Sequence, residues 1–218
     1  SEEDLCKHML KCKLMGVRVH SYRKRDYLYF APPFIAESMA WQYTIECIAR
    51  TLKYEEDFRT TNGYGWPKIL YLQMDNTSRD NKNSYLMMYL SYLVESGIFK
   101  EIHLNFLPVG HTHEDIDQMF SVITRKLLHK DAYTFPQWVE LVNSAYNDEL
   151  DRIYLVDLVR TLHDYRPWLE KYASEDRYHE CRSEVFYFHF VQDESQTGGC
   201  VVWYYAMFSY CRNRPGFG

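Results

Sequence analysis

Hydrophobic and polar residues follow one another along the chain in patterns that predict strands and helices in turn. Alternation over residues 13–30, broken by a basic turn, predicts a β-hairpin. Apolar residues then recur with helical spacing from Glu37 to Tyr54. The continuous apolar run Ile69–Leu72 is typical of a strand buried on both faces of a sheet. The first third of the chain is therefore expected to combine strands with a helix.

The middle of the chain continues this succession with short connections. A helix is expected from about Asn83, with Gly97 closing it. Alternation over residues 102–106 predicts the next strand, and a further helix is expected to open at Thr112. Residues 67–128 thus follow the order strand, helix, strand, helix, which is the repeating unit of an α/β sheet.

The last third of the chain changes character. Pro136 lies in the first turn of another predicted helix. Residues 151–173 are also expected to be helical, with an interruption at Pro167. Two aromatic segments, 185–191 and 200–210, flank a glycine-containing loop and predict a C-terminal hairpin.

The composition is that of a globular protein. Of the 218 residues, 46% are hydrophobic and 25% are charged, which excludes an intrinsically disordered chain. No apolar run approaches the roughly 18 residues that a membrane span requires, so we expect no membrane among its partners. The formal net charge of −5 excludes a strongly basic nucleic-acid footprint over the chain as a whole.

The six cysteines show no CxxC spacing. This favours free or buried thiols in a reducing, intracellular compartment. A zinc site built from Cys6, His8 and Cys12 is the alternative, although it has no fourth ligand at the usual spacing.

Acidic residues and histidines follow two consecutive predicted strands. Asp75 comes directly after the first of them, where ligands gather in open α/β sheets. After the second strand, His113 and Asp117 are four residues apart and share one face of a helix, and Glu114 is three residues from Asp117. If the strands are neighbours, these carboxylates reach one sheet edge. Such carboxylates bind Mg²⁺ or Mn²⁺ and support in-line displacement at a phosphoryl group.

Each motif also has a structural explanation. An Asp-Asn pair after a strand commonly forms a turn, and acids at a helix start, including Asp115 as a cap, complement the helix dipole. A structural zinc site formed by His111, His113 and Asp117 is a third alternative, although closed zinc sites favour Cys or His at all four places.

Three segments carry a resemblance to a known family: residues 72–76 (LQMDN), 81–83 (NKN) and 106–121 (FLPVGHTHEDIDQMFS). They resemble an uncharacterised domain that recurs in transposon-related eukaryotic proteins. That domain looks like a divergent member of the RNase H-like group, which includes transposases and retroviral-type integrases. The resemblance is strong over about 67–128 and weak beyond about 175.

The resemblance implies an α/β fold with an RNase H-like mixed sheet flanked by helices. It implies a transposase-type core over residues 1–165 and a small C-terminal α/β extension with the aromatic hairpin over 166–218. In RNase H-like enzymes, acids on the first strand, the fourth strand and a late helix bind two metal ions. The first-strand acid should precede the hairpin, where only residues 1–12 stand. We therefore expect either that the first strand is missing, the chain being a fragment of a longer protein, or that the triad is incomplete.

By the same resemblance, Asp75 takes the fourth-strand role, and Asp117 is the best candidate for the helix acid, with Glu114 second. The histidines depart from the usual third-acid motif of that group, and we expect His111 or His113 to bind metal, to shuttle a proton or simply to fix the loop. The expected catalytic residues are Asp75, Asp117, Glu114 and His113, and the expected ligands of Mg²⁺ or Mn²⁺ are Asp75, Asp117, His111 and His113.

These expectations lead to two alternative functions for the protein. The first is a transposase-derived, metal-dependent nuclease or strand transferase that acts on DNA in the nucleus. Its expected phosphate contacts are Arg23, Lys24, Arg25 and Lys82, although a solvated hairpin tip explains the basic turn equally well. The second is a catalytically inactive module on the same fold, which binds nucleic acid or a protein, the latter through the C-terminal hairpin. The net charge and the missing first acid favour the second.

Overall fold

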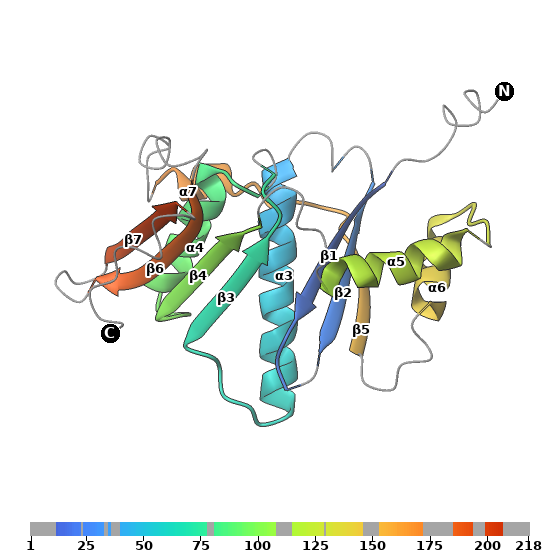
Figure 1. Cartoon of the computed structure of the whole chain (residues 1–218), viewed down its shortest axis with the longest axis horizontal. Helices are drawn as coiled ribbons and strands as arrows, with labels where there is room; N and C mark the ends of the chain where they lie inside the picture. Colours follow the sequence, from blue (N-terminus) through green and yellow to red (C-terminus); the bar gives the residue numbers. More distant parts are fainter. Residues whose placement is uncertain are drawn as a thin grey trace. The chain divides into compact units, whose positions relative to one another are not determined.

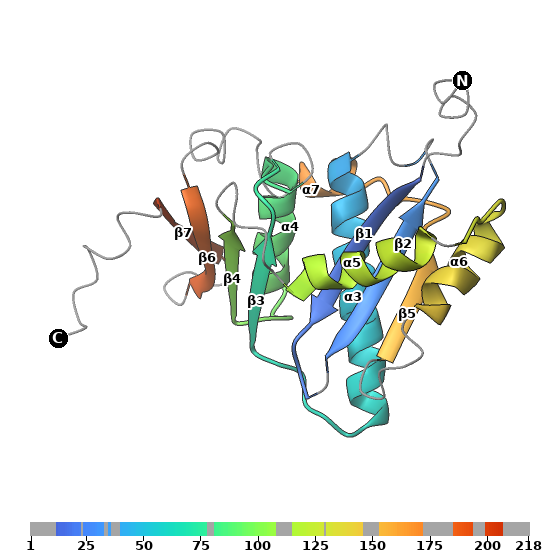
Figure 2. The ribbon, with the colours of Figure 1, turned by 45° about the vertical axis from the view of Figure 1, so that its right-hand side comes forward.

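The computed structural model describes residues 12–22, 24–32, 35, 40–77, 81–107, 115–128, 130–145, 153–171, 185–193 and 199–206. The chain separates into two units (Figures 1 and 2). Unit 1 contains residues 1–39, 46–51 and 112–162, and unit 2 contains residues 40–45, 52–111 and 163–218. Each unit is described by itself.

Unit 1 is built on a three-stranded mixed sheet. Strands β1 (Lys13–Val19) and β2 (Arg25–Ala31) pair antiparallel, which confirms the predicted hairpin. Strand β5 (Ile153–Leu158) pairs in parallel with β2 on its other side, so the order is β1-β2-β5. Every residue of the central strand β2 is buried.

The prediction of a helix over residues 151–173 is wrong. This segment contains β5 and, within its described residues, only the short helix α7 (Arg166–Leu169). The sequence Ile-Tyr-Leu-Val at the start of β5 has β-branched and aromatic side chains that suit a strand. Pro167 lies in the first turn of α7, where its missing N–H costs nothing, so it begins a helix rather than interrupting one.

Two helices cover the sheet of unit 1. Helix α5 (Asp115–Leu127) and helix α6 (Phe135–Ser144) pack against β2, and in both ribbon views α5 crosses β1 and β2 (Figures 1 and 2). A capping box between Thr134 and Gln137 starts α6, with a proline in its first turn as predicted. The buried cluster between these helices and the sheet consists of Leu28, Phe30, Met119, Ile123 and Val142.

The helix predicted from residue 37 is present as α3 (Ala40–Thr61), and its residues 46–51 belong to unit 1. Arg50 of this segment donates to Glu46 at 2.7 Å and to Asp157 of β5 at 2.9 Å. Thr51 shares a 2.8 Å hydrogen bond with Tyr29 of β2. These contacts attach the middle of α3 to the sheet of unit 1.

Unit 2 is built on a four-stranded sheet of order β3-β4-β6-β7. Strands β3 (Ile69–Met74) and β4 (Glu101–Phe106) are parallel, and β6 (Val185–Asp193) pairs antiparallel with β4. Strand β7 (Gly199–Ala206) completes the predicted C-terminal hairpin with β6. Helix α4 (Ser84–Glu95) begins where it was predicted and packs on one face of this sheet, and the structure shows Asn83 as its N-cap.

Strand β3 is not buried on both faces, contrary to the prediction from its apolar run. Ile69 and Tyr71 are 40% and 70% exposed, and the alternate residues Leu70 and Leu72 are half-buried. The reason is position, because β3 is the end strand of the described sheet, whereas the apolar residues of β4 are buried under α4. Within the described residues, no helix has the length and apolar composition needed to cross a bilayer.

Candidate functional site

Asp75 is held at the carboxyl end of β3 by hydrogen bonds from its own loop. Its Oδ1 accepts from the backbone N–H of Thr77 at 3.4 Å, from the Thr77 hydroxyl at 2.7 Å and from the Asn81 side-chain amide. Asn81 is buried, and its own Oδ1 accepts from the Thr44 hydroxyl of α3 at 3.2 Å. The exposed carboxylate of Asp75 is thereby fixed in position by a buried amide.

Strands β3 and β4 deliver their following segments to the same edge of the sheet. Met74 and Phe106 are partners in parallel register, and the N–H of Leu107 donates to the Met74 carbonyl at 3.0 Å. Leu107, after which the chain continues toward His111, therefore lies at the same sheet edge as Asp75. His111, His113 and Glu114 themselves lie outside the described residues.

Asp117 lies in the first turn of α5 and is exposed. Its helix start is attached to the hairpin of unit 1, because Arg18 donates to the Asp115 carbonyl and Lys24 donates to the Asp115 carboxylate at 2.7 Å. The hydrogen bond and charge of Lys24 lower the pKa of Asp115. Asp75 belongs to unit 2 and Asp117 to unit 1, so their convergence stays a prediction.

Two of the four predicted phosphate contacts are buried. Arg25 is the first residue of the central strand β2 and is 1% exposed. Lys82 is 3% exposed, and its Nζ lies over the rings of Phe106 and Phe186, 5.5 and 4.9 Å from their centroids. Burial lowers the pKa of Lys82. Neither side chain has the solvent-facing position that the prediction assumed.

Of the other two residues, Lys24 is half exposed and forms an ion pair with Asp115, and Arg23 lies outside the described residues. The two described residues of the basic turn are thus a paired surface lysine and a buried strand residue.

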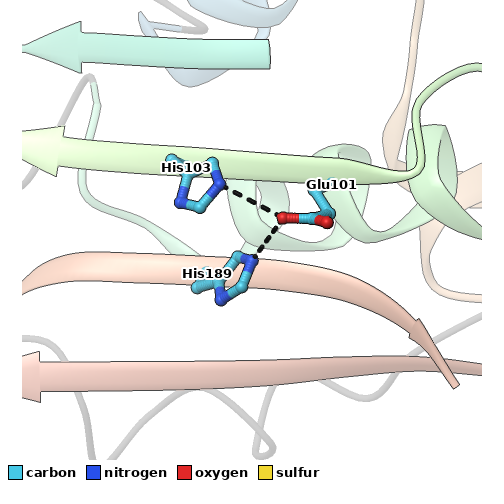
Figure 3. A group of neighbouring side chains, drawn as sticks. All are labelled: Glu101, His103 and His189. Carbon is cyan, nitrogen blue, oxygen red and sulfur yellow. Dashed lines mark hydrogen bonds and ion pairs between the residues drawn. The ribbon is translucent and has the colours of Figure 1, made fainter. Parts of the chain in front are cut away.

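A group of side chains that the sequence analysis did not single out meets on the sheet of unit 2. Glu101 and His103 project from β4, and His189 projects from β6 toward them (Figure 3). The Glu101 Oε2 lies 3.4 Å from His103 Nε2 and 3.2 Å from His189 Nε2. The two imidazole rings stack with their centroids 4.3 Å apart. We call Glu101, His103 and His189 the Glu-His-His cluster.

Two tyrosines orient this cluster. The Tyr187 hydroxyl lies 2.6 Å from His103 Nδ1, and the Tyr71 ring stacks on the His103 ring at 4.7 Å. The side chains of His103, His189 and Glu101 are 13%, 23% and 41% exposed, so the carboxylate remains open to solvent. Glu101 is thus the most exposed side chain of the cluster, and His103, which both tyrosines contact, is the most buried.

The sequence contained part of the signal for this cluster. Glu101 and His103 are two residues apart in one strand, as are Tyr187 and His189 in another, so each pair shares a face. The missing information was the pairing of β4 with β6, which places His103 directly opposite His189.

These features define a mixed α/β protein with two small mixed sheets and, in its described part, five helices. The family described as a domain of unknown function, DUF7869, matches residues 3–208, and the chain belongs to that family. No curated protein and no solved structure matches the chain.

Proposed function

We propose that this domain is a transposase-derived, RNase H-like enzyme that carries out metal-dependent phosphoryl transfer on DNA, as a nuclease or strand transferase. The observation that carries the proposal is the parallel pairing of β3 with β4. Asp75 and Leu107, after which the chain continues to His111 and His113, follow these two strands at one sheet edge. Ligands of open α/β sheets bind at such an edge.

In this function Asp75 is a metal ligand whose orientation is set in advance. Thr77 and Asn81 hold one carboxylate oxygen, so little conformational entropy is lost when the group binds a cation. Oxygen donors suit Mg²⁺ and Mn²⁺. Such an ion, when bound, lowers the pKa of a coordinated water and stabilises charge on the transferred phosphoryl group. Asp117, with Glu114 and the two histidines, is proposed to complete the site.

The second candidate is an inactive interaction module on the same fold. The burial of Arg25 and Lys82 favours it, because it leaves fewer exposed cations for a DNA backbone than the sequence indicated. The net charge of −5 points in the same direction.

Manganese calorimetry separates the two candidates. It is carried out in a His189→Gln background, so that the Glu-His-His cluster does not contribute. Asp75→Asn and Asp117→Asn should each weaken Mn²⁺ binding by at least about tenfold, because each removes a charged ligand from one site. Asp131→Asn, an exposed carboxylate outside the motifs, is the matched control and should change nothing.

A folded protein that binds no Mn²⁺, or whose binding is insensitive to Asp75→Asn, would leave the interaction module as the better proposal. Cleavage of DNA in the presence of Mn²⁺, abolished by Asp75→Asn and retained in Asp131→Asn, would support the enzyme.

A further inference from the structure

We propose that the Glu-His-His cluster binds a divalent transition metal, with Zn²⁺ as the first choice, at a site distinct from that of Asp75. The three ligand atoms already converge. They lie within 4.8 Å of one another, and both imidazole Nε2 atoms point at the same carboxylate oxygen (Figure 3). The cluster lies entirely in unit 2, so its geometry depends on a single sheet.

The two nitrogen–oxygen separations in the cluster suit a tetrahedral ion. Bonds of about 2.0–2.1 Å around zinc place neighbouring ligand atoms roughly 3.3–3.4 Å apart. The two nitrogen–oxygen separations in the cluster are 3.4 and 3.2 Å. The β4–β6 ladder fixes the backbones of His103 and His189 opposite each other, so only side-chain adjustment is needed to admit the ion.

The donor set selects the metal. Two imidazoles and one carboxylate form a three-ligand set that leaves a fourth position for water. Imidazole nitrogen binds Zn²⁺, Co²⁺ and Ni²⁺ well, whereas Mg²⁺ prefers oxygen ligands throughout. The cluster and the oxygen-rich surroundings of Asp75 therefore differ in the cations that they prefer.

Tyr187 supplies the outer hydrogen bond that metal-binding histidines require. When His103 Nε2 binds a metal, its proton must lie on Nδ1, which then donates to the Tyr187 oxygen 2.6 Å away. A hydroxyl also donates to an unprotonated Nδ1, so Tyr187 satisfies the ring with and without the ion. The Tyr71 ring, stacked on His103, restricts the remaining rotation.

The test is zinc calorimetry on the metal-free protein, together with the visible spectrum of the Co²⁺-substituted protein. We expect one Zn²⁺ per chain at this site. His103→Gln and His189→Gln should weaken binding by at least about 100-fold, and Tyr187→Phe, which keeps all three ligands, by about 10- to 100-fold. His163→Gln, a histidine of the same unit outside the cluster, should have no effect.

Two further variants keep this proposal separate from the proposed enzyme. Asp75→Asn and His113→Gln should leave Zn²⁺ affinity unchanged even where they abolish Mn²⁺ binding. Zinc binding that depends on His113 rather than on His189 would overturn the cluster site, as would a folded wild-type protein that binds no zinc.

Circular dichroism checks that each variant is folded. Where His189→Gln does not fold, the Co²⁺ spectra of the wild-type protein and of Tyr187→Phe test the site instead. Intense bands of a four-coordinate ion that weaken in Tyr187→Phe support the site. The weak spectrum of the hydrated ion, or a spectrum unchanged in Tyr187→Phe, overturns it.

Discussion

His103 and His189 are direct partners in the antiparallel β4–β6 ladder, and their rings stack with an angle of 13° between their planes. Tyr71 of β3 is the register partner of His103 on the other side and stacks on the same imidazole. Three strands thus contribute a continuous row of rings to one face of the sheet. The opposite face carries the apolar residues of β4, so a single strand separates a polar aromatic surface from a buried core.

Gly16 of β1 leaves room for helix α5. A methyl group at this position would overlap the Met119 Cε and lie 3.0 Å from the Phe120 ring, and Met119 is itself fully buried. Gly16→Ala should therefore lower the free energy of unfolding by about 1–3 kcal/mol, as overpacking does elsewhere. Urea denaturation measures the change. Gly65→Ala is the matched control, since nothing lies within 4 Å of its added methyl group.

Asn83 caps helix α4, which packs on the sheet of unit 2. Its side chain accepts a 3.0 Å hydrogen bond from the backbone N–H of Leu86. Asn83→Ala should lower the free energy of unfolding by about 1 kcal/mol, because the N–H of Leu86 loses its partner. Asn83→Ser, which restores a capping oxygen, should recover most of the loss. Equal stability of the alanine and serine variants would contradict a capping role.

Arg50 neutralises the charge of a buried carboxylate. Glu46 has a nearly inaccessible side chain, and Arg50 links it to Asp157 of β5. Arg50→Gln should destabilise the protein by about 2 kcal/mol, since Glu46 then keeps its burial without its charged partner. Lys53→Gln, which removes an exposed lysine from pairs with Glu56 and Asp57, should leave chemical denaturation curves unchanged.

Lys82 should make stability depend on pH. Burial lowers the pKa of its amino group, so between that lowered value and the ordinary value of about 10.4 the unfolded chain binds more protons than the folded one. Stability then increases with pH across this window. Relative to Lys82→Met, the wild-type protein should gain stability as the pH is raised from neutral toward 10.

Denaturation at several pH values tests this prediction, with the exposed Lys68→Met variant as the control for loss of a surface charge. A difference between wild type and Lys82→Met that stays constant with pH would show that burial does not affect this group.

The elements that could be predicted from the sequence are those specified by local periodicity and turn residues. The hairpin of β1 and β2, the start and closing glycine of α4, and the alternation of β4 are each specified within a few residues, so periodicity and turn chemistry were enough. The order from β3 to α5 followed in the same way, and it placed Asp75 directly after a strand.

Strand pairing and burial between distant segments became visible only in the folded chain. Strand β5 is a strand because β2, far earlier in the chain, offers it a parallel ladder, and Arg25 and Lys82 are buried because other elements cover them. The Glu-His-His cluster exists because β6 pairs with β4 rather than with another strand. Strand pairing and burial depend on contacts between residues far apart in sequence, and local patterns of polarity do not specify those partners.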